Sequence, residues 1–428
     1  MRMRGRVPHG LAVALLLALP AAAQEAATAK PPSSAELRRQ AGLQAATDAA
    51  ADALGWLLDN QHASGRWGGP ETPMIYDGFW SNPETHKSWT VATTGLAVIA
   101  LLDAQDQASF LTEAGREDVH RAVDAGIDYL VANARVKRPS VWDTDNTWAY
   151  VYGLAAFTRA ARDPRLAEGN RAASIAAGGR IMLDQLMAYQ TPAGGWAYYD
   201  MEAKAVVPAW ATSFQTAVAI LGLLEAEALG WAVDREKVQV AVDTLVRCRL
   251  PDGSYTYSVE AIPAQDAGTG IDRIRGSLSR IQVGNLALMR AGAAGYRAPA
   301  LGDEPARGLG LFFREHHYLD IARGRPHPHE AYHDNSGYFY FFGHYYAGEL
   351  LPELEPAVAR RWAPALVQEV AKTQAEDGSM IDYFMNDYGR PYGVAYGLSA
   401  LLRARTVLHE ANPSTSPADA AASPGPTR

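Results

Sequence analysis

A short turn motif recurs along the chain and restricts the folds open to it. Segment 61–67 (QHASGRW) holds a Gln, a Gly four residues later and a Trp six residues later, and segment 190–196 repeats this spacing. Segments 249–255 and 374–380 keep the Gly, with Arg in the Gln place of the first and Tyr or Met in the aromatic place. These glycines fit a repeat of about 60 residues, which indicates one supersecondary unit copied along the chain. Two turns are then missing, and they fall in the connectors at 130–142 and 313–325.

Apolar residues on either side of each turn predict a pair of helices. Before the first turn, apolar residues follow the i, i+3, i+4 spacing of a helix with one buried face. After it, residues 90–102 are apolar nearly all round, as in a helix buried on most sides. The only short strand candidate is 255–259. We expect helix pairs at 50–58 and 90–102, 123–132 and 147–161, 175–189 and 212–226, 238–248 and 278–291, 306–313 and 336–351, and 363–373 and 393–404.

Six helical hairpins over residues 46–405 give an all-α domain that is either an open solenoid or a closed ring. A solenoid needs terminal units with polar outer faces. The first and last units here keep the apolar pattern, which favours closure into a single α6/α6 toroid. The helices after the turns would then lie inside, with their N-termini at one end of a central cavity.

The turns resemble those of the prenyltransferase and squalene-cyclase repeat superfamily, whose hairpins have this length and carry Gln-x3-Gly-x-Trp. The resemblance covers residues 46–405 and implies a terpenoid cyclase-like α/α toroid with a hydrophobic or mixed central cavity. In that superfamily the Gln and the aromatic residue tie an outer helix to the next turn, which implies a structural role for Gln61, Trp67, Gln190 and Trp196. Because the ring hosts cyclases, transferases, lyases and binding domains, it does not specify the reaction.

The N-terminus has the pattern of a secretory signal peptide. Three arginines within residues 2–6 precede an apolar run at 11–19, and Ala21–Ala23 follow. This predicts a signal peptide over 1–23 and export to the periplasm or the extracellular space. No other segment reaches 18 uninterrupted apolar residues, so we expect no transmembrane segment in the mature protein. Residues 24–45 are expected to be flexible and 406–428 disordered, since neither carries enough large apolar groups to offset the entropy of ordering.

The composition of the chain excludes some classes of binding partner and metal site. The chain has 39 Lys and Arg against 47 Asp and Glu, a formal net charge of −8, which argues against nucleic acid. Its one cysteine, Cys248, excludes an intramolecular disulfide and any multi-thiolate zinc site. The oligomeric state is left open.

Segment 143–147 (DTDNT) resembles the Asp-x-Asp-Asp-Thr motif of squalene-type cyclases, which starts an inner helix. The resemblance implies that Asp145 is the acid that protonates an alkene, with Asp143 as a second catalytic candidate. The fourth place departs from the motif because it holds Asn146. The alternative is a helix cap that accepts backbone N–H bonds.

The fifth unit is rich in histidine. His327, His329 and His333, with Asp334 beside them, could supply ligands to Zn²⁺ or, with more oxygen ligands, Ca²⁺. His333 is also a catalytic candidate, as the base of a lyase. The alternative is a polar cavity mouth lined by imidazole and aromatic groups. Transfer of a prenyl group to protein is disfavoured because no cysteine lies near the expected cavity.

Polar and aromatic residues near the expected starts of the inner helices complete the candidate ligand-binding set. Arg side chains bind carboxylates and flat rings stack on sugars. The chain is therefore predicted to be an exported toroid that binds, and in one version transforms, a lipid of isoprenoid type or a glycan. The alternatives are a non-catalytic binding scaffold and a lyase acting on an acidic polysaccharide. The candidate ligand-binding residues are Trp89, Trp148, Tyr152, Trp210, Gln215, Arg280, Asp334, Tyr338, His344, Arg390 and Tyr392.

Overall fold

The computed structural model describes residues 33–69, 83–107, 109–137, 145–199, 207–260, 270–383 and 388–410. The predicted signal peptide, Asp143 and residues 411–428 lie outside these ranges. The α-helices are α2 (Ser34–Asp59), α3 (Pro83–Gln105), α4 (Glu113–Ala132), α5 (Thr147–Ala160), α6 (Gly169–Ala188), α7 (Ser213–Ala228), α8 (Arg235–Cys248), α9 (Ile274–Ala293), α10 (Glu304–Arg314), α11 (His317–Ala322), α12 (Phe339–Leu350), α13 (Pro356–Ala371) and α14 (Gly389–Glu410).

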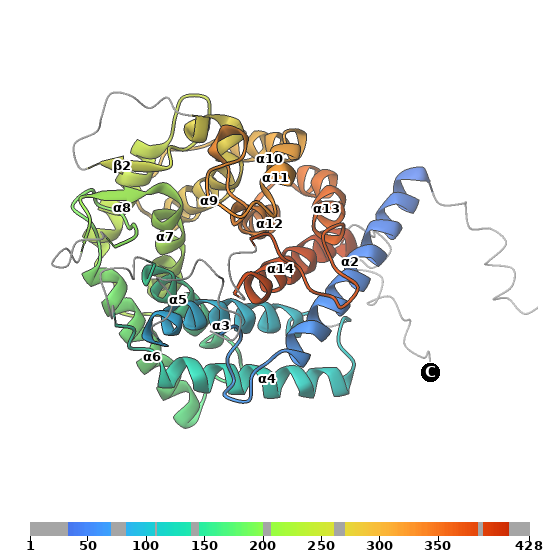
Figure 1. Cartoon of the computed structure of the whole chain (residues 1–428), viewed down its shortest axis with the longest axis horizontal. Coiled ribbons are helices and arrows are strands. Elements are labelled where there is room, and N and C mark those ends of the chain that lie inside the picture. The colour runs from blue at the N-terminus through green and yellow to red at the C-terminus, as the bar shows by residue number, and fades with distance from the viewer. Residues whose placement is uncertain are drawn as a thin grey trace, which may run out of the picture.

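The second helix of each predicted pair belongs to a closed inner ring (Figure 1). Around that ring, α3 packs on α5, α5 on α7, α7 on α9, α9 on α12, α12 on α14, and α14 on α3. The helices before the turns lie outside them, as α4 does on α3 and α6 on α5. The predicted all-α toroid and its closure are confirmed. The number of hairpins stays a prediction, because the fifth unit has two short helices, α10 and α11, ahead of its inner helix.

The glutamine of each turn joins that turn to the next outer helix. The Gln61 side-chain amide donates to the carbonyl of Gly65 at 3.0 Å and to that of Ala122, in α4, at 2.9 Å. Gln190 makes the same pair of bonds within its turn and to Lys237 of α8. In the fourth turn Arg249 replaces Gln, and it forms an ion pair with Glu304 of α10. The structural role that the resemblance implies for these positions therefore agrees with the contacts.

The aromatic residue of the turn fills the space under it. Trp67 and Trp196 are fully buried. Each indole N–H donates to a carbonyl of the preceding outer helix at 2.8 Å, on Leu57 and Leu186 respectively. A buried indole whose only polar atom is paired contributes its large apolar surface at little cost.

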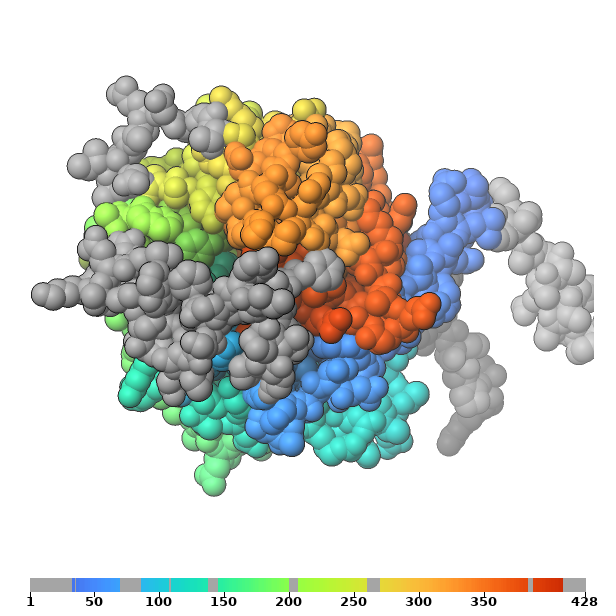
Figure 2. Space-filling model, viewed as in Figure 1, coloured from blue at the N-terminus to red at the C-terminus, as the bar shows by residue number. Residues whose placement is uncertain are grey.

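The two ends of the described chain meet at a seam. Gln374, in the last turn, donates to the carbonyl of Ala49 at 2.9 Å, and α2 packs along α14. The blue surface of α2 abuts the orange-red surface of the last unit in Figure 2. Helix α2 begins at Ser34, where Ser33 accepts from the Glu36 N–H at 3.2 Å. Residues 34–45, which were expected to be flexible, are therefore helical, and α14 likewise runs past the expected boundary to Glu410.

A small antiparallel sheet accompanies the ring. Strand β1 (Trp210–Thr212) pairs with β2 (Ser258–Glu260), with Trp210 opposite Glu260. Strand β2 overlaps the end of the strand segment expected at 255–259. Among the described helices, none combines the length and the apolar character needed to cross a membrane.

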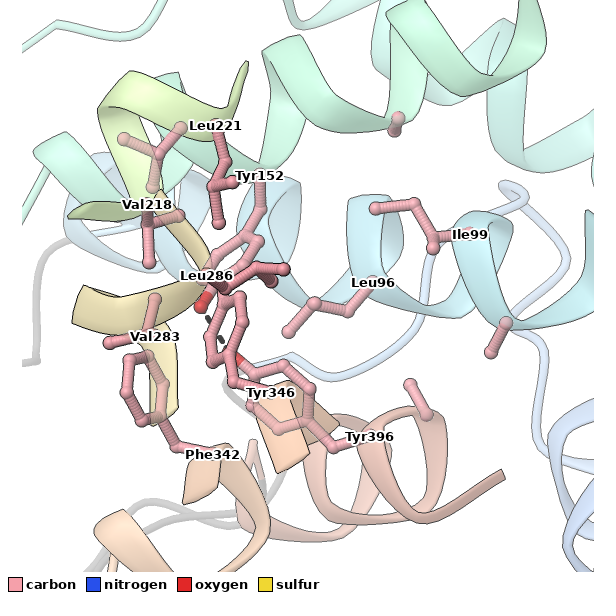
Figure 3. Packing of buried hydrophobic residues seen from close by; sticks show 14 of the residues in the cluster. Leu96, Ile99, Tyr152, Val218, Leu221, Val283, Leu286, Phe342, Tyr346 and Tyr396 are labelled. Carbon is pink, nitrogen blue, oxygen red and sulfur yellow. Dashed lines mark hydrogen bonds between the residues drawn. The ribbon is translucent and has the colours of Figure 1, made fainter. Parts of the chain in front are cut away.

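Side chains from the inner helices fill the middle of the ring (Figure 3). The labelled residues come from α3, α5, α7, α9, α12 and α14, and they include Leu96, Tyr152, Leu286, Phe342 and Tyr396. The ring therefore has a packed core and is not an open channel through its length.

The glycine turns allow a paired test of how tightly the units pack. Gly65 and Gly253 occupy equivalent turns with φ of 88° and 87°. A Cβ on Gly65 would lie 2.1 Å from the Ala125 carbonyl oxygen, whereas one on Gly253 would meet nothing within 4 Å. We expect Gly253→Ala to cost about 1–2 kcal/mol of unfolding free energy and Gly65→Ala about 3 kcal/mol or more. Urea unfolding of both variants measures this, and equal losses would contradict the close packing of the first turn on α4.

Candidate functional site

A cavity of about 440 Å³ lies where the inner helices begin. Of its described lining residues, most are Trp, Tyr or Phe, and Asp145 is the single carboxylate. The lining residues are Trp89, Ala92, Thr93, Leu96, Asp145, Trp148, Tyr152, Tyr198, Phe214, Tyr257, Pro328, His329, Tyr338, Phe339, Phe342, Tyr383, Tyr388, Tyr392 and Tyr396.

Most of the wall comes from rows of residues four apart on the inner helices. Helix α5 supplies Trp148 and Tyr152, and the α14 segment supplies Tyr388, Tyr392 and Tyr396. Residues four apart share one helix face, so the aromatic side chains of each row point toward the axis of the toroid. The turns add further rings, two residues after the buried aromatic in the case of Tyr198 and Tyr257.

The tyrosine hydroxyls of the wall are paired with protein groups. The Tyr257 hydroxyl lies 3.3 Å from that of Tyr198 and 3.5 Å from that of Tyr338. The Tyr338 hydroxyl is also 3.1 Å from Nε2 of His329. Burial, followed by the neighbouring tyrosines, holds the pKa of Tyr198 and of Tyr338 well above the ordinary value.

Three more tyrosine hydroxyls of the wall are also paired with protein groups. Tyr396 donates to Tyr152, Tyr392 donates to Asp382, and the Tyr388 hydroxyl lies 2.8 Å from Nδ1 of His86. Since these hydroxyls are engaged with protein groups, they leave mainly ring faces and edges of the wall for a ligand.

Asp145 is placed in the cavity at the start of α5, as the motif predicts. Its charge contributes to the raised pKa of Tyr198, behind burial and two other tyrosines, so the carboxylate lies near that phenol. Asn146 does not line the cavity: it is buried and its side-chain amide donates to the Lys137 carbonyl at 3.1 Å. Asn146 makes no side-chain bond that caps α5.

Arg280 lies behind the wall and not in it. It is almost fully buried on α9, and its guanidinium sits 5.6 Å from the Tyr257 ring and 5.4 Å from the Phe339 ring. It donates to the carbonyls of Tyr255 and Ile271. Burial lowers its pKa to about 10. Its positive charge is therefore in cation–π contact with two aromatic rings that do line the cavity.

Several other predicted ligand-binding residues are placed outside the described lining. Gln215 is fully buried and donates to Thr147 at 3.0 Å. Trp210 packs on Tyr198 from β1, and Arg390 is exposed on α14. The predicted ligand-binding residues that do line the cavity are Trp89, Trp148, Tyr152, Tyr338 and Tyr392.

His344 also lies away from the cavity, in contact with another histidine. Its Nδ1 is 2.7 Å from the Tyr340 carbonyl and its Nε2 is 2.9 Å from Nε2 of His316. The ring is fully buried. Burial, and then the charge of His316, lowers the pKa of His344 well below the ordinary value, so the ring is neutral.

The three predicted metal-ligating histidines do not converge with one another. His329 lines the cavity, with Nδ1 2.7 Å from the Asp334 carbonyl and Nε2 at Tyr338. His333 packs edge-on against Tyr318, and neither His327, His333 nor Asp334 belongs to the described lining. Within the described parts of the chain, the set of at least three potential metal-ligand groups that does come together is His316, Asp320 and Glu369.

Sequence reasoning missed most of the aromatic wall and one buried acid. The rows four apart on the inner helices were the available signal for Phe342, Tyr388 and Tyr396. Asp382 had no such signal. It is fully buried behind Tyr392. Its carboxylate accepts a hydrogen bond from the Tyr392 hydroxyl and another, at 3.0 Å, from the Phe341 N–H.

Comparison with known proteins identifies the fold. No protein-family model matches the chain, and no curated protein sequence matches it. A UGL variant with dGlcA-Glc-Rha-Glc superposes with a TM-score of 0.52 at 16% identity, covering 83% of this chain and 95% of that one. An inactive variant of the alpha-1,6-mannanase GH76A of Salegentibacter sp. HEL1_6, in complex with alpha-1,6-mannotetrose, gives 0.50 at 11% identity, covering 85% and 99%.

A type II terpene cyclase, MstE from Scytonema, in complex with geranylgeranyl dihydroxybenzoate, gives a TM-score of 0.48 at 13% identity, covering 86% of this chain and 99% of that one. At such identities the likeness shows the fold and nothing of the chemistry. The α/α toroid that the turns predict is therefore confirmed.

Asp382 makes stability depend on pH. Burial raises its pKa to about 7, against the hydrogen bonds from Tyr392 and Phe341 that lower it. A raised native pKa means that the folded state binds the proton more tightly, so this stabilisation is lost as pH rises towards 7. From pH 5 to pH 8 we expect a loss of about 3 kcal/mol in unfolding free energy from this group.

Urea unfolding of the wild type and of Asp382→Asn at both pH values isolates that contribution, because the other groups cancel in the comparison. The variant should show the smaller pH dependence. Parallel curves would mean that Asp382 is already ionised in the folded protein at pH 5.

Proposed function

We propose that the protein binds a lipid of isoprenoid type in the aromatic cavity, and that Asp145 is the acid that protonates a double bond of that ligand. The observation that carries the proposal is the wall itself: aromatic rings, most of whose tyrosine hydroxyls are paired with protein groups, and Asp145, the one carboxylate among the described lining residues. A volume of about 440 Å³ falls in the range of about 300–1,000 Å³ that small-molecule sites occupy.

The wall suits a ligand that is apolar and becomes cationic. When an acid transfers its proton to an alkene carbon, the O–H bond breaks, a C–H bond forms and the neighbouring carbon is left as a cation. Ring faces stabilise such a charge by their quadrupole, and Trp148, Tyr152 and Phe342 are placed to do so. The cation ends its reaction by losing a proton to water or to a base, and the Asp145 carboxylate regains a proton from solvent.

A neutral glycan is the second candidate. One neighbour with this fold, the mannanase variant, holds the neutral saccharide alpha-1,6-mannotetrose in its structure, and flat rings such as Trp89 and Trp148 can stack on a sugar. An acidic saccharide, such as the dGlcA-Glc-Rha-Glc of the UGL variant, is less well supported, since no Arg or Lys is among the described residues of the wall. A non-catalytic binding role keeps the same cavity without the proton transfer.

We also propose that the protein is exported to the periplasm or the extracellular space, on the strength of the arginines, the apolar run and the alanines in residues 1–23. Mass spectrometry of the protein recovered outside the cytoplasm tests this, with a mature N-terminus at Gln24 as the expected result.

The ligand proposal is tested with the chain from Gln24 onwards, against squalene and geranylgeraniol in one panel and neutral manno-oligosaccharides in the other. A ligand that binds only the folded state raises the unfolding midpoint as its concentration exceeds the Kd. We expect a rise with the isoprenoids alone and a roughly tenfold weaker Kd in Trp148→Ala, since a stacked aromatic contact contributes about 0.5–1.5 kcal/mol.

Gas chromatography of the extracted lipid then separates binding from catalysis. The wild type should form a cyclised isomer of unchanged mass, and Asp145→Asn should bind the isoprenoid without forming it. Asp118→Asn, an exposed carboxylate on α4, serves as the control. Binding without product in the wild type would refute the acid and leave a binding protein, and a response to oligosaccharides alone would favour the glycan.

A further inference from the structure

A second cluster of ionisable side chains lies outside the cavity, where α11, α12 and α13 meet. It contains His316, just before α11, Asp320 of α11, His344 of α12, and Glu369 and Lys372 at the end of α13. None of these residues is among the described lining of the cavity. The two histidines are buried, whereas Asp320 and Lys372 are 36% and 39% exposed at their side chains, so the cluster opens to solvent on one side.

The hydrogen bonds fix which ring nitrogens carry a proton. The Tyr340 carbonyl can only accept, so Nδ1 of the neutral His344 ring donates to it at 2.7 Å. Nε2 of His344 then carries no proton and presents a lone pair. Since Nε2 of His316 lies 2.9 Å from it, the His316 nitrogen must be the donor. Both proton positions of the pair are assigned by this chain of contacts.

Nδ1 of His316 is left facing two carboxylates. It lies 3.2 Å from Oδ2 of Asp320 and 3.1 Å from Oε2 of Glu369. A proton on Nδ1 satisfies these two anionic oxygens, and a metal ion bound by the three atoms would take the place of that proton. Oε2 of Glu369 is buried and receives no well-aligned hydrogen bond, although His316 and Lys372 are within ion-pair distance of it.

We propose that Nδ1 of His316 and the carboxylates of Asp320 and Glu369 form a site for a divalent transition-metal ion, with Zn²⁺ the best fit. The three ligand atoms lie within 4.8 Å of one another. Ligand atoms at Zn²⁺ distances of about 2.0–2.1 Å in tetrahedral array are about 3.3 Å apart, close to the two separations from Nδ1. One imidazole and two carboxylates suit Zn²⁺ or Mn²⁺ better than a soft metal, and a divalent ion neutralises both charges.

Lys372 is the group that competes for the same carboxylates. Its ammonium lies 2.9 Å from Oδ1 of Asp320 and also contacts Glu369. Burial by itself raises the pKa of Asp320, but the hydrogen bonds from His316 and Lys372 outweigh it and hold that pKa well below the ordinary value. Because the lysine is partly exposed, it can swing to solvent and leave the fourth tetrahedral position to water.

His344 acts as a positioning residue. A metal-bound histidine usually donates its second N–H to a fixed acceptor, which sets the ring orientation. Here the acceptor is Nε2 of His344, itself held by the carbonyl one helical turn before it. The site thus joins the α11 segment to α12 and α13, the same α12 whose first turns line the cavity.

The test is calorimetric titration of the chelator-treated full chain with Zn²⁺, with Mn²⁺ and Mg²⁺ in parallel. We expect one Zn²⁺ per chain, binding weakened more than 100-fold in Glu369→Gln, and about 10–100-fold in His344→Asn. Lys372→Gln removes the competing ammonium, and a gain of about fivefold is expected, as for a partly exposed ion pair. His62→Asn, an exposed histidine, should leave the titration unchanged.

The variants distinguish a metal site from a network of hydrogen bonds and ion pairs that binds no metal. Lys372→Gln keeps every ligand, so it still reports if Glu369→Gln fails to fold as judged by circular dichroism. Stoichiometric Zn²⁺ binding that strengthens in Lys372→Gln supports the site. Absence of stoichiometric binding, its survival in a folded Glu369→Gln, or its loss in His333→Asn would overturn it, the last by moving the metal to the histidine-rich loop.

Discussion

The hydrogen bonds of the turn glutamines hold the toroid together. Each of these side chains donates twice, once within its own turn and once to the next outer helix, and Arg249 achieves the second link with an ion pair. The outward link always points to the following unit. In the last turn, the following unit is the first one, and the bond from Gln374 to Ala49 closes the ring. A local link repeated at these four turns therefore contributes to the closure of the whole ring.

Closure also explains where the cavity lies. With the inner helices parallel around one axis, their first turns gather at the same end, and the rows of residues four apart on each helix meet there. Farther along the axis the same helices carry Leu286, Tyr346 and their neighbours, which pack solidly (Figure 3). The cavity is thus bounded by the ring that surrounds it and by the core beneath it. Arg280 places a charge behind this wall without exposing it.

The sequence predicted the ring, and the position of Asp145 at the start of α5, because both depend on local spacing. The turns recur at a fixed interval, and a motif at the start of one helix remains at that end of the ring. Gln215 and His344 were harder to place, since whether a residue on an inner helix faces the axis or a neighbouring helix depends on the rotation of that helix. The pairing of His316 with Glu369 joins segments more than 50 positions apart in the sequence, with no repeated spacing to signal it.

The seam between α2 and α14 has a consequence for how the chain is made. Helix α14, the last described one, packs on α2, the first described one, as well as on α3, α12 and α13. Until α14 emerges, the apolar faces of those four helices lack their partner, and the ring remains an open arc. A nascent chain of this protein must therefore keep α2 and α3 from other contacts until α14 has been made.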